Sequence, residues 1–319
     1  MTLRIAVACS PALGDAGEAL GRARALADAA SGEVIALALG HPDPQALVAR
    51  GADAVRAFSH PLLDEAHVEA MAAAIVHACR ADVPAAVLLN HNAIGADLAP
   101  RLALRLDGCA AMGCVAIDHD AGELRYTRPR QGGIAREVLS FRAAPVVATL
   151  RPGNYDAPAP DPGRKGSVTA IAFEPDGVRT RIVERKREAG SGPRLEDAKV
   201  VVSGGRGLNG PDGFKVLEAL AGVLGGVVGA SRVPCDLGWC PRSWQIGLTG
   251  KTVRPELYIA VGISGASHHL AGCGNAKAIV AVNTDAQAAI FREARYGIVG
   301  DYQQVIPALV EEIRKGRTG

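Results

Sequence analysis

Aromatic side chains are scarce in this chain of 319 residues, at 4% of the sequence, whereas hydrophobic residues make up 48% and glycines number 38. A core with so few aromatic side chains must consist of Ala, Val, Leu and Ile. Such a core suits parallel sheets covered by Ala-rich helices better than an aromatic-rich β-sandwich. The length is sufficient for two domains of ordinary size. We therefore expect an α/β protein with two domains.

The chain also lacks an excess of charge of either sign. Its 35 basic residues against 33 acidic ones leave a formal net charge of +2, which gives no reason to expect nucleic acid or an anionic membrane as a partner. No stretch approaches the roughly 18 uninterrupted apolar residues of a membrane span. The apolar segment Leu3–Ala8 lacks the features of a secretion signal. We expect a cytoplasmic protein with no membrane insertion.

Close cysteine pairs are missing as well. None of the seven cysteines forms a C-x-x-C motif, and four residues separate Cys109 from Cys114 and Cys235 from Cys240. A zinc or iron–sulfur site needs tighter pairs, usually in two sets. An odd number of cysteines in a chain without a secretion signal indicates reduced thiols, and we expect no metal site.

The first 150 residues alternate apolar runs with helical patterns. Such alternation implies βαβ units and a parallel sheet. Asp15, Asp43 and Asp64 are suited to cap helices. A β-rich segment from Cys109 to Arg151 follows, with a turn at Gly132-Gly133. We predict strands over residues 3–8, 34–39, 52–58 and 85–89, and helices over residues 16–30, from 44, over 64–80 and over 94–106.

The α/β pattern stops between Pro152 and Pro193. Six prolines fall in this stretch, among them a charged run over residues 179–188. Two short strands, Val168–Phe173 and Val178–Val183, are predicted to form an edge hairpin. We interpret the stretch as a Pro-rich connection that starts at about residue 152. The N-terminal domain is predicted to span residues 1–190 and the C-terminal domain residues 191–319.

A second α/β pattern begins at Lys199–Val202. Repeated strand–glycine–helix units in so small a domain favour a doubly wound parallel sheet with a ligand at the carboxyl ends of its strands. We predict further strands over residues 226–230, 257–261 and 278–282, and helices over 214–224 and 302–315.

Gly205-Arg-Gly-Leu-Asn-Gly210 matches G-x-G-x-x-G between a predicted strand and a predicted helix. A Rossmann dinucleotide site also needs an acidic residue about 20 residues later, to hold the ribose. Here the second strand ends at Ser231-Arg232, and an arginine at that place could favour NADP. A tight structural turn, an FAD site and an NADP site are all consistent with this motif alone.

Two other motifs are incomplete. Thr249-Gly-Lys-Thr252 resembles the end of a P-loop, but Gln245 stands where a Walker A motif needs glycine. Gly262-Ile-Ser-Gly265 resembles a nucleophile elbow, but Ala266 replaces its last glycine. The sequence thus argues against a kinase, an ATPase or a hydrolase, and it offers no catalytic residue.

His268-His269 and Arg232 can be structural or can bind a ligand. The histidines lie about one turn into a helix predicted to begin at Ser264-Gly265, where a helix N-terminus favours a negative group. Arg232 is predicted to end a buried strand, a costly place for a cation unless it meets an anion or a π-system. Position therefore favours ligand contact for both.

The last 120 or so residues, taken together, resemble the FAD-binding domain of the electron transfer flavoprotein alpha subunit family. The N-terminal half resembles the family more loosely, chiefly at Gly95–Leu102. The matching blocks of the C-terminal half need no gaps between them: Gly204–Leu208, Ala230–Arg232, Asp236–Trp239, Gln245–Lys251, Leu257–Ala266, His269–Gly272, Ile279–Asn283 and Tyr296–Asp301.

The resemblance implies an FAD site without acid–base chemistry of its own. It also implies that the Thr249 hydroxyl lies near the flavin N5 and the His269 imidazole near the N1–O2 edge. The implied site residues are Arg206, Ser231, Arg232, Ile246, Gly247, Leu248, Thr249, Ser264, Gly265, Ala266, Ser267, His268, His269, Asn283, Asp301 and Tyr302.

The partners implied by the resemblance form an electron transport chain. The alpha subunit pairs with a beta subunit, which carries AMP or, in electron-bifurcating members, a second FAD. FAD accepts electrons from flavoprotein dehydrogenases, such as the acyl-CoA dehydrogenases of fatty acid oxidation, and passes them to a membrane quinone oxidoreductase. The competing hypotheses are an NADP-dependent dehydrogenase and a non-redox nucleotide-binding or scaffolding subunit.

The chain departs from the family at four places near the expected site. Leu248 stands where many members have Gln, Ser267-His268 where Ile-Gln is common, Cys273 where Met is common and Ala289 where Pro is common. These differences leave the fold unaffected but change the surroundings expected for the flavin, and hence its potential.

Overall fold

The computed structural model describes residues 2–120, 122–131, 135–185 and 194–317. The chain divides into two compact units, the first containing most of the described residues up to 185 and the second those from 194 onward. Each unit has its own parallel sheet, so the predicted α/β class with two domains is confirmed. The predicted boundary at residue 190 and the predicted turn at Gly132-Gly133 lie outside the described residues.

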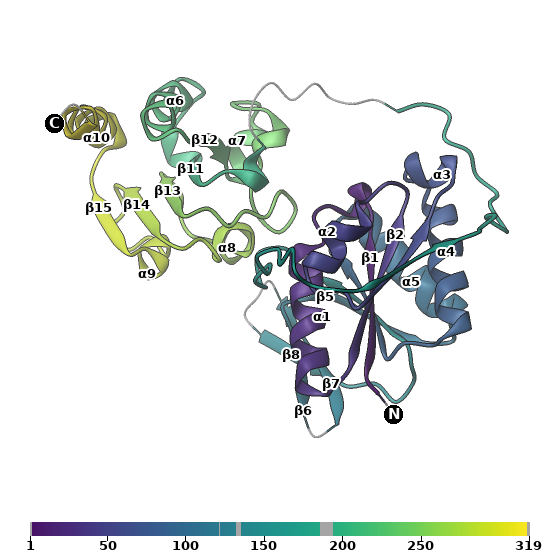
Figure 1. Cartoon of the computed structure of the whole chain (residues 1–319). Coiled ribbons are helices and arrows are strands. Elements are labelled where there is room, and N and C mark those ends of the chain that lie inside the picture. The colour runs from purple at the N-terminus through teal and green to yellow at the C-terminus, as the bar shows by residue number, and fades with distance from the viewer. Residues whose placement is uncertain (1, 121, 132–134, 186–193, 318–319) are drawn as a thin grey trace. The chain divides into compact units, whose positions relative to one another are not determined.

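The first unit is built on a seven-stranded sheet in which all neighbouring strands run parallel. Its strand order is β10-β3-β2-β1-β4-β9-β5; β1, β2 and β5 are labelled in Figure 1. The strands are β1 (Arg4–Cys9), β2 (Glu33–Leu39), β3 (Ala54–Phe58), β4 (Ala86–Asn90), β5 (Cys109–Cys114), β9 (Val146–Leu150) and β10 (Ser167–Ile171).

Helices cover both faces of this sheet, and their apolar sides form two separate cores. One core contains buried side chains of α1 (Gly17–Ala29) and α2 (Pro44–Ala49), and the other those of α4 (Val68–Ala81) and α5 (Ala93–Arg105). Ala, Leu, Ile and Val dominate both cores, as the low aromatic content predicts. Asp43 caps α2 as predicted, by accepting from the Gln45 N–H at 2.9 Å.

The predicted helix over residues 64–80 is divided in the structure. Asp64 ends a short helix, α3 (Pro61–Asp64), and His67 precedes the longer α4. Asp64 therefore does not cap the long helix. The β-rich segment after Cys109 is confirmed: β5 joins the large sheet, and three antiparallel strands form a second sheet, β6 (Ala116–Asp120), β7 (Glu123–Arg130) and β8 (Ala135–Leu139).

The predicted edge hairpin is wrong. Among the described residues of this stretch, 152–185, only β10 forms a strand, and it pairs in parallel with β3 rather than with a partner of its own. The chain over Val178–Val183 is tied instead to the start of α4. The Arg179 and Thr180 N–H groups donate to Oε2 of Glu69 at 2.8 and 3.0 Å, and Nε2 of His67 lies 3.0 Å from the Thr180 carbonyl oxygen. These long-range bonds replace the local pairing of a hairpin.

The second unit is a doubly wound five-stranded parallel sheet in the order β12-β11-β13-β14-β15. Helices α6 and α10 share one core with the sheet, and α8 and α9 share the other. The elements are β11 (Val200–Gly204), α6 (Asp212–Leu224), β12 (Val227–Ala230), α7 (Arg232–Asp236), β13 (Leu257–Val261), α8 (Ser267–Cys273), β14 (Ile279–Asn283), α9 (Ile290–Glu293), β15 (Tyr296–Val299) and α10 (Tyr302–Arg317).

The winding of this sheet reverses between β11 and β13. After β11 the chain adds β12 on one side, and from β13 onward it adds strands on the other side. The loops after β11 and β13 therefore leave the sheet in opposite directions and open a crevice at the carboxyl ends of these strands. In doubly wound sheets this is the usual place of a ligand.

Candidate functional site

Glycines bring the two loops of the crevice into contact. The Gly205 N–H donates to the Val261 carbonyl oxygen at 2.9 Å, and the Gly207 N–H to that of Gly262 at 3.0 Å. A Cβ atom added at Gly205 would overlap the Gly262 carbonyl oxygen, and Gly262 itself has a φ of 62°, in the left-handed region. The G-x-G-x-x-G motif thus fixes the floor of the crevice.

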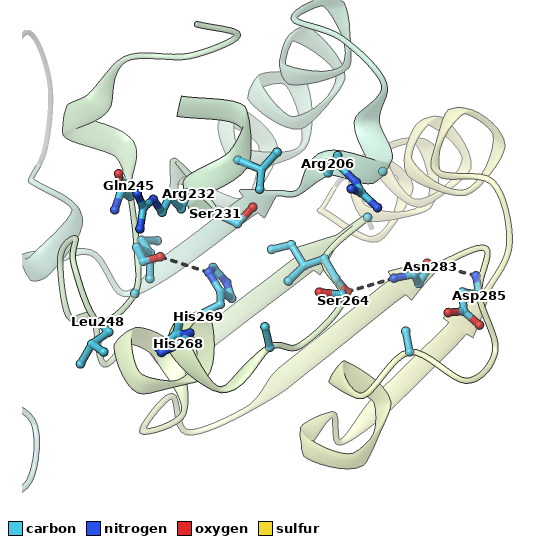
Figure 2. A pocket seen from close by; sticks show the side chains of 18 of the residues that line it. Arg206, Ser231, Arg232, Gln245, Leu248, Ser264, His268, His269, Asn283 and Asp285 are labelled. Carbon is cyan, nitrogen blue, oxygen red and sulfur yellow. Dashed lines mark hydrogen bonds between the residues drawn. The ribbon is translucent and has the colours of Figure 1, made fainter. Parts of the chain in front are cut away.

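The cavity at this place has a volume of about 720 Å³. Loops that follow four neighbouring strands supply its side chains (Figure 2). Twelve of the sixteen predicted site residues line it, namely Arg206, Ser231, Arg232, Ile246, Gly247, Leu248, Thr249, Ser264, Ala266, His268, His269 and Asn283.

The other four predicted residues are outside the cavity lining, and three of them support the structure around it. Gly265, with a φ of 84°, lies so close to the backbone of Ile290 that any Cβ atom would overlap it. Ser267 is the exposed first residue of α8. Asp301 accepts from the Gln303 N–H at 2.9 Å at the start of α10, and the buried Tyr302 donates through its hydroxyl to the Leu208 carbonyl oxygen at 3.0 Å.

Nine lining residues were not predicted. Most of them adjoin a predicted residue in the chain, so extending each loop by one or two positions would have found them. Gln245 and Asp285 have the clearest polar roles, because they bond Thr249 and Asn283 respectively. The nine are Gly207, Asn209, Val233, Gln245, Gly262, Ile263, Thr284, Asp285 and Ala288.

Gln245 orients the Thr249 hydroxyl. The Gln245 side chain is buried, and its Nε2 donates to Oγ1 of Thr249 at 3.0 Å. Because this bond uses Oγ1 as an acceptor, the hydroxyl hydrogen of Thr249 stays available to donate. The cavity thus contains a hydroxyl donor whose oxygen is fixed in place.

His269 is held from both sides of its ring. Nδ1 lies 3.1 Å from the Ile246 carbonyl oxygen and Nε2 lies 2.9 Å from the Tyr258 hydroxyl. Burial lowers the pKa of His269 to about 4, with the bond to Ile246 opposing the shift. The neutral ring therefore donates from Nδ1 and accepts at Nε2. This imidazole has no free N–H for a ligand, in contrast to the expectation from the sequence.

The neighbouring His268 faces the cavity and is exposed. Both histidines lie in the first turn of α8, which begins at Ser267, three residues later than predicted. Successive helical residues point in directions about 100° apart, so one histidine is buried against Tyr258 and the other is open to the cavity. His268 is therefore the imidazole that can reach a ligand here.

Arg232 does not end a buried strand as predicted. β12 ends at Ala230, and Arg232 is the first residue of α7 with 65% of its side chain exposed. Its Nε donates to Oδ2 of Asp236 at 3.0 Å, while Arg242 lies 3.7 Å from the other oxygen of the same carboxylate. Asp236 thus holds one side of the Arg232 guanidinium. Figure 2 shows Arg232 among the side chains that line the cavity.

Anion-binding groups line the crevice, whereas metal ligands do not gather there. Arg206 lines the crevice and makes no ion pair with any residue that the structure describes. The N–H groups of Ser264 and Ala266 have no acceptor among the residues that the structure describes. No cluster of three His, Cys, Asp or Glu suited to a metal ion occurs among the described residues, and none of their helices is long and apolar enough to cross a membrane.

Sequence comparisons agree with this architecture. The family model of the electron transfer flavoprotein domain matches residues 16–176, and that of the electron transfer flavoprotein FAD-binding domain matches residues 194–274. The electron transfer flavoprotein subunit alpha of Thermoanaerobacterium thermosaccharolyticum is 45% identical over 307 residues, covering 93% of this chain and 92% of that protein. The chain belongs to the electron transfer flavoprotein alpha subunit family.

Other family members are nearly as similar. The alpha subunit of Bacillus subtilis is 40% identical over 287 residues, which cover 89% of this chain and 88% of that protein. Protein FixB of Azotobacter vinelandii is 36% identical over 317 residues, which cover 95% of this chain and 87% of that protein. Membership identifies FAD as the cofactor and implies a heterodimer with a beta subunit. The G-x-G-x-x-G motif and Arg232 lie within the FAD-binding match, which favours FAD over NADP.

Proposed function

We propose that this chain transfers electrons from flavoprotein dehydrogenases, such as acyl-CoA dehydrogenases, to a membrane quinone oxidoreductase. In this proposal the beta subunit carries AMP or a second FAD. One observation carries the proposal: the cavity of the FAD-binding domain combines a glycine crossing, two arginines and a fixed hydroxyl donor. The roles in fatty acid oxidation and in the cytoplasm stay predictions.

The residues present suit an anionic, planar dinucleotide. A volume of about 720 Å³ lies within the range of roughly 300–1,000 Å³ typical of ligand cavities. The glycine crossing allows phosphate oxygens to approach the backbone closely, and N–H groups such as those of Ser264 and Ala266 favour anions. Arg206 adds a positive charge at the same loops. We infer that these groups hold the diphosphate of FAD.

Three further side chains suit the flavin ring. Arg232 contributes a permanent positive charge that favours electron-rich forms of a neighbouring ring. The Thr249 hydroxyl can donate a hydrogen bond, since Gln245 already occupies its acceptor side. His268 takes the place that the sequence alone assigns to His269, because the ring nitrogens of His269 are both engaged. These side chains bind and tune the flavin.

Bound FAD supplies the redox chemistry, and the chain supplies position and charge. His269 and Tyr258 are hydrogen-bonded to each other, and no hydrogen bond joins a nucleophilic side chain to a base among the described lining residues. This composition suits an electron carrier better than an enzyme with a substrate of its own.

The proposal is tested on the heterodimer produced with its beta subunit. We expect the complex to show flavin absorbance and to be reduced by an acyl-CoA dehydrogenase in the presence of its substrate. The reduced complex should then pass electrons to a quinone oxidoreductase. A complex that binds FAD but accepts no electrons from any acyl-CoA dehydrogenase would contradict the donor class.

Removal of the beta subunit provides a second test. A partner that binds the flavin-loaded form stabilises that form by mass action. We therefore expect the isolated chain to lose FAD during extended dialysis and the heterodimer to retain it. An isolated chain that keeps one FAD per chain and is reduced at the heterodimer's rate would contradict this dependence.

A further inference from the structure

Cys235 and Cys240 are in contact. Their Sγ atoms lie 3.5 Å apart, and both thiols are free. Cys109 and Cys114 have the same spacing in the sequence but lie at opposite ends of the strand β5. The Cys114 thiol donates instead to the Ala111 carbonyl oxygen. The shared spacing thus yields one adjacent pair and one separated pair, which gives an internal control.

A tight turn brings the two thiols together. After α7 the chain turns at Gly238, which has a φ of 71° and donates to the Cys235 carbonyl oxygen at 3.1 Å. Trp239 donates to the Pro234 carbonyl oxygen at 2.9 Å. Cys235 is buried and Cys240 is half-buried, so the second thiol is the more accessible of the two.

This pair adjoins the tether of Arg232. Cys235 lies three residues after Arg232 and directly before Asp236, whose carboxylate contacts both Arg232 and Arg242. Cys240 lies two residues before Arg242. A covalent link between the thiols would join the same two segments that Asp236 joins through ion pairs, namely α7 and the turn at Arg242–Trp244.

We propose that Cys235 and Cys240 form a reversible disulfide on exposure to a hydroperoxide, and that this bond fixes α7 and its Arg232 at the rim of the FAD cavity. The formation of the bond follows from the contact between the thiols alone. Its effect on the flavin rests on the proposed function.

The reaction is a two-electron oxidation of the thiols. The sulfur of Cys240 attacks one oxygen of hydrogen peroxide, the O–O bond breaks, and a sulfenic acid and water form. The sulfur of Cys235 then attacks the sulfenic sulfur, so that the S–S bond forms and a second water leaves. The two thiols lose two hydrogens and two electrons in all, and the peroxide is reduced to two waters.

Burial makes this reaction slow near neutral pH. It raises the pKa of Cys240 to about 12, and contact with Cys235 adds to the shift. The pKa of Cys235 is raised by burial and by Asp236, while the thiol of Cys240 and the Arg242 guanidinium lower it. Because the thiolate is the nucleophile, disulfide formation should accelerate as the pH rises toward the raised pKa of Cys240.

The test uses the intact heterodimer. It is treated with hydrogen peroxide, alkylated and digested with trypsin, which releases residues 233–242 as one peptide that contains both cysteines. We expect this peptide to be lighter by two hydrogens and unreactive to the alkylating agent, and dithiothreitol should reverse both changes. A peptide that stays reduced, or that carries a sulfinic acid on Cys240 alone, would overturn the proposal.

Variants separate the pair from the other thiols. Cys240→Ser should abolish the change in the peptide, whereas Cys109→Ser should leave it intact. Disulfide formation in the wild-type heterodimer is informative even if either variant fails to fold. Two results together would also contradict the assignment of the disulfide to Cys235 and Cys240. They are a disulfide between other cysteines in Cys240→Ser and no disulfide within residues 233–242 of the wild type.

The effect of the disulfide on the FAD cavity is measured separately. The rate of FAD release is compared between the reduced and the oxidised heterodimer, and we expect it to be several-fold slower once the disulfide is present. An unchanged rate, with the disulfide verified by mass, would overturn the coupling to Arg232. A heterodimer that holds no flavin would instead contradict the proposed function, while the thiol assay would still stand.

Discussion

The Tyr258 hydroxyl donates a hydrogen bond to the unprotonated Nε2 of His269, at 2.9 Å and away from solvent. Tyr258 lies on the central strand β13 and His269 on α8, so the bond joins the sheet to the helix beside the cavity. The substitution Tyr258→Phe removes this bond. A buried acceptor without a donor costs about 1–3 kcal/mol, and the free energy of unfolding from urea titrations should fall by that amount.

His269 also predicts how stability depends on pH. Its pKa is about 4 in the folded chain, against an ordinary value of 6.5, because burial disfavours the charged ring. Between these values the unfolded state binds the additional proton, so the free energy of unfolding should fall as the pH drops from 6.5 to 4. The whole loss amounts to about 3 kcal/mol at 1.36 kcal/mol per pKa unit.

Two variants check this pH dependence. Urea titrations at several pH values should show it reduced in His269→Gln, where no imidazole titrates at this place. The exposed neighbour serves as the control, and His268→Gln should keep the wild-type profile. An unchanged slope in His269→Gln would assign the pH dependence to other groups.

Arg232 is predicted to favour flavin reduction. The substitution Arg232→Ala removes a positive charge from the rim of the cavity and should lower the midpoint potential of the bound flavin, measured by potentiometric titration of the heterodimer. Each 1.4 kcal/mol or so of lost stabilisation changes the reduction equilibrium about tenfold. The fall in midpoint potential should be small, because 65% of the Arg232 side chain is exposed and solvent screens its charge.

The partner of Arg232 gives a sharper comparison. Asp236→Asn keeps the guanidinium but weakens its tether, so we expect FAD to dissociate faster than from the wild type. Arg242→Ala is the matched control, since Arg242 contacts the same carboxylate but is absent from the cavity lining.

For Arg232→Ala itself, a midpoint potential equal to or higher than that of the wild type would rule out the proposed role of the Arg232 charge.

The glycine crossing predicts a large difference between two Gly→Ala substitutions. At Gly205 the new Cβ atom would overlap the Gly262 carbonyl oxygen, so Gly205→Ala should separate the two loops and abolish FAD retention in gel filtration. At Gly222, on the open side of α6, nothing lies within 4 Å of an added Cβ. Gly222→Ala should therefore raise the free energy of unfolding by about 0.5–1 kcal/mol. Equal FAD retention by the two variants would show that the crossing is dispensable.

Glu69 is predicted to hold the segment after β10. Its carboxylate accepts from the N–H groups of Arg179 and Thr180, and these bonds lower its pKa to about 2. They should therefore persist at all pH values above the ordinary pKa and be lost as the pH falls toward 2. Limited trypsin digestion at neutral pH should cleave after Arg179 faster in Glu69→Gln than in the wild type. The exposed Glu65, changed to Gln, should have no effect on this rate.

Local pattern was sufficient to predict most of the scaffold. The strands near Val34–Leu39 and Leu257–Val261 are continuous apolar runs, the signature of strands buried on both faces. The strand β15 was missed because its four residues are all exposed and carry little of that signal. The hairpin was mispredicted because Glu69, more than 100 residues away, competes for the backbone of Arg179.

The candidate site was predicted in outline and not in its bonding. Sequence blocks identified the loops that follow the strands, since glycines and hydroxyls cluster there. They could not show that α8 begins at Ser267, and that single offset decides which histidine is buried. The identical spacing of the two cysteine pairs could not reveal which pair is in contact. The strand β5 separates Cys109 from Cys114, whereas the turn at Gly238 brings Cys235 and Cys240 together.

The strand β10 determines where the first unit can be cut. It occupies the outer position beside β3, so a fragment that stops at Leu150 would leave one edge of β3 (Ala54–Phe58) without a neighbouring strand, while β2 covers the other edge. Exposed strand edges recruit other chains, and such a fragment should aggregate. A fragment that continues past Ile171 retains this cover. The first unit therefore becomes separable only after Ile171, beyond the prolines at 152–162.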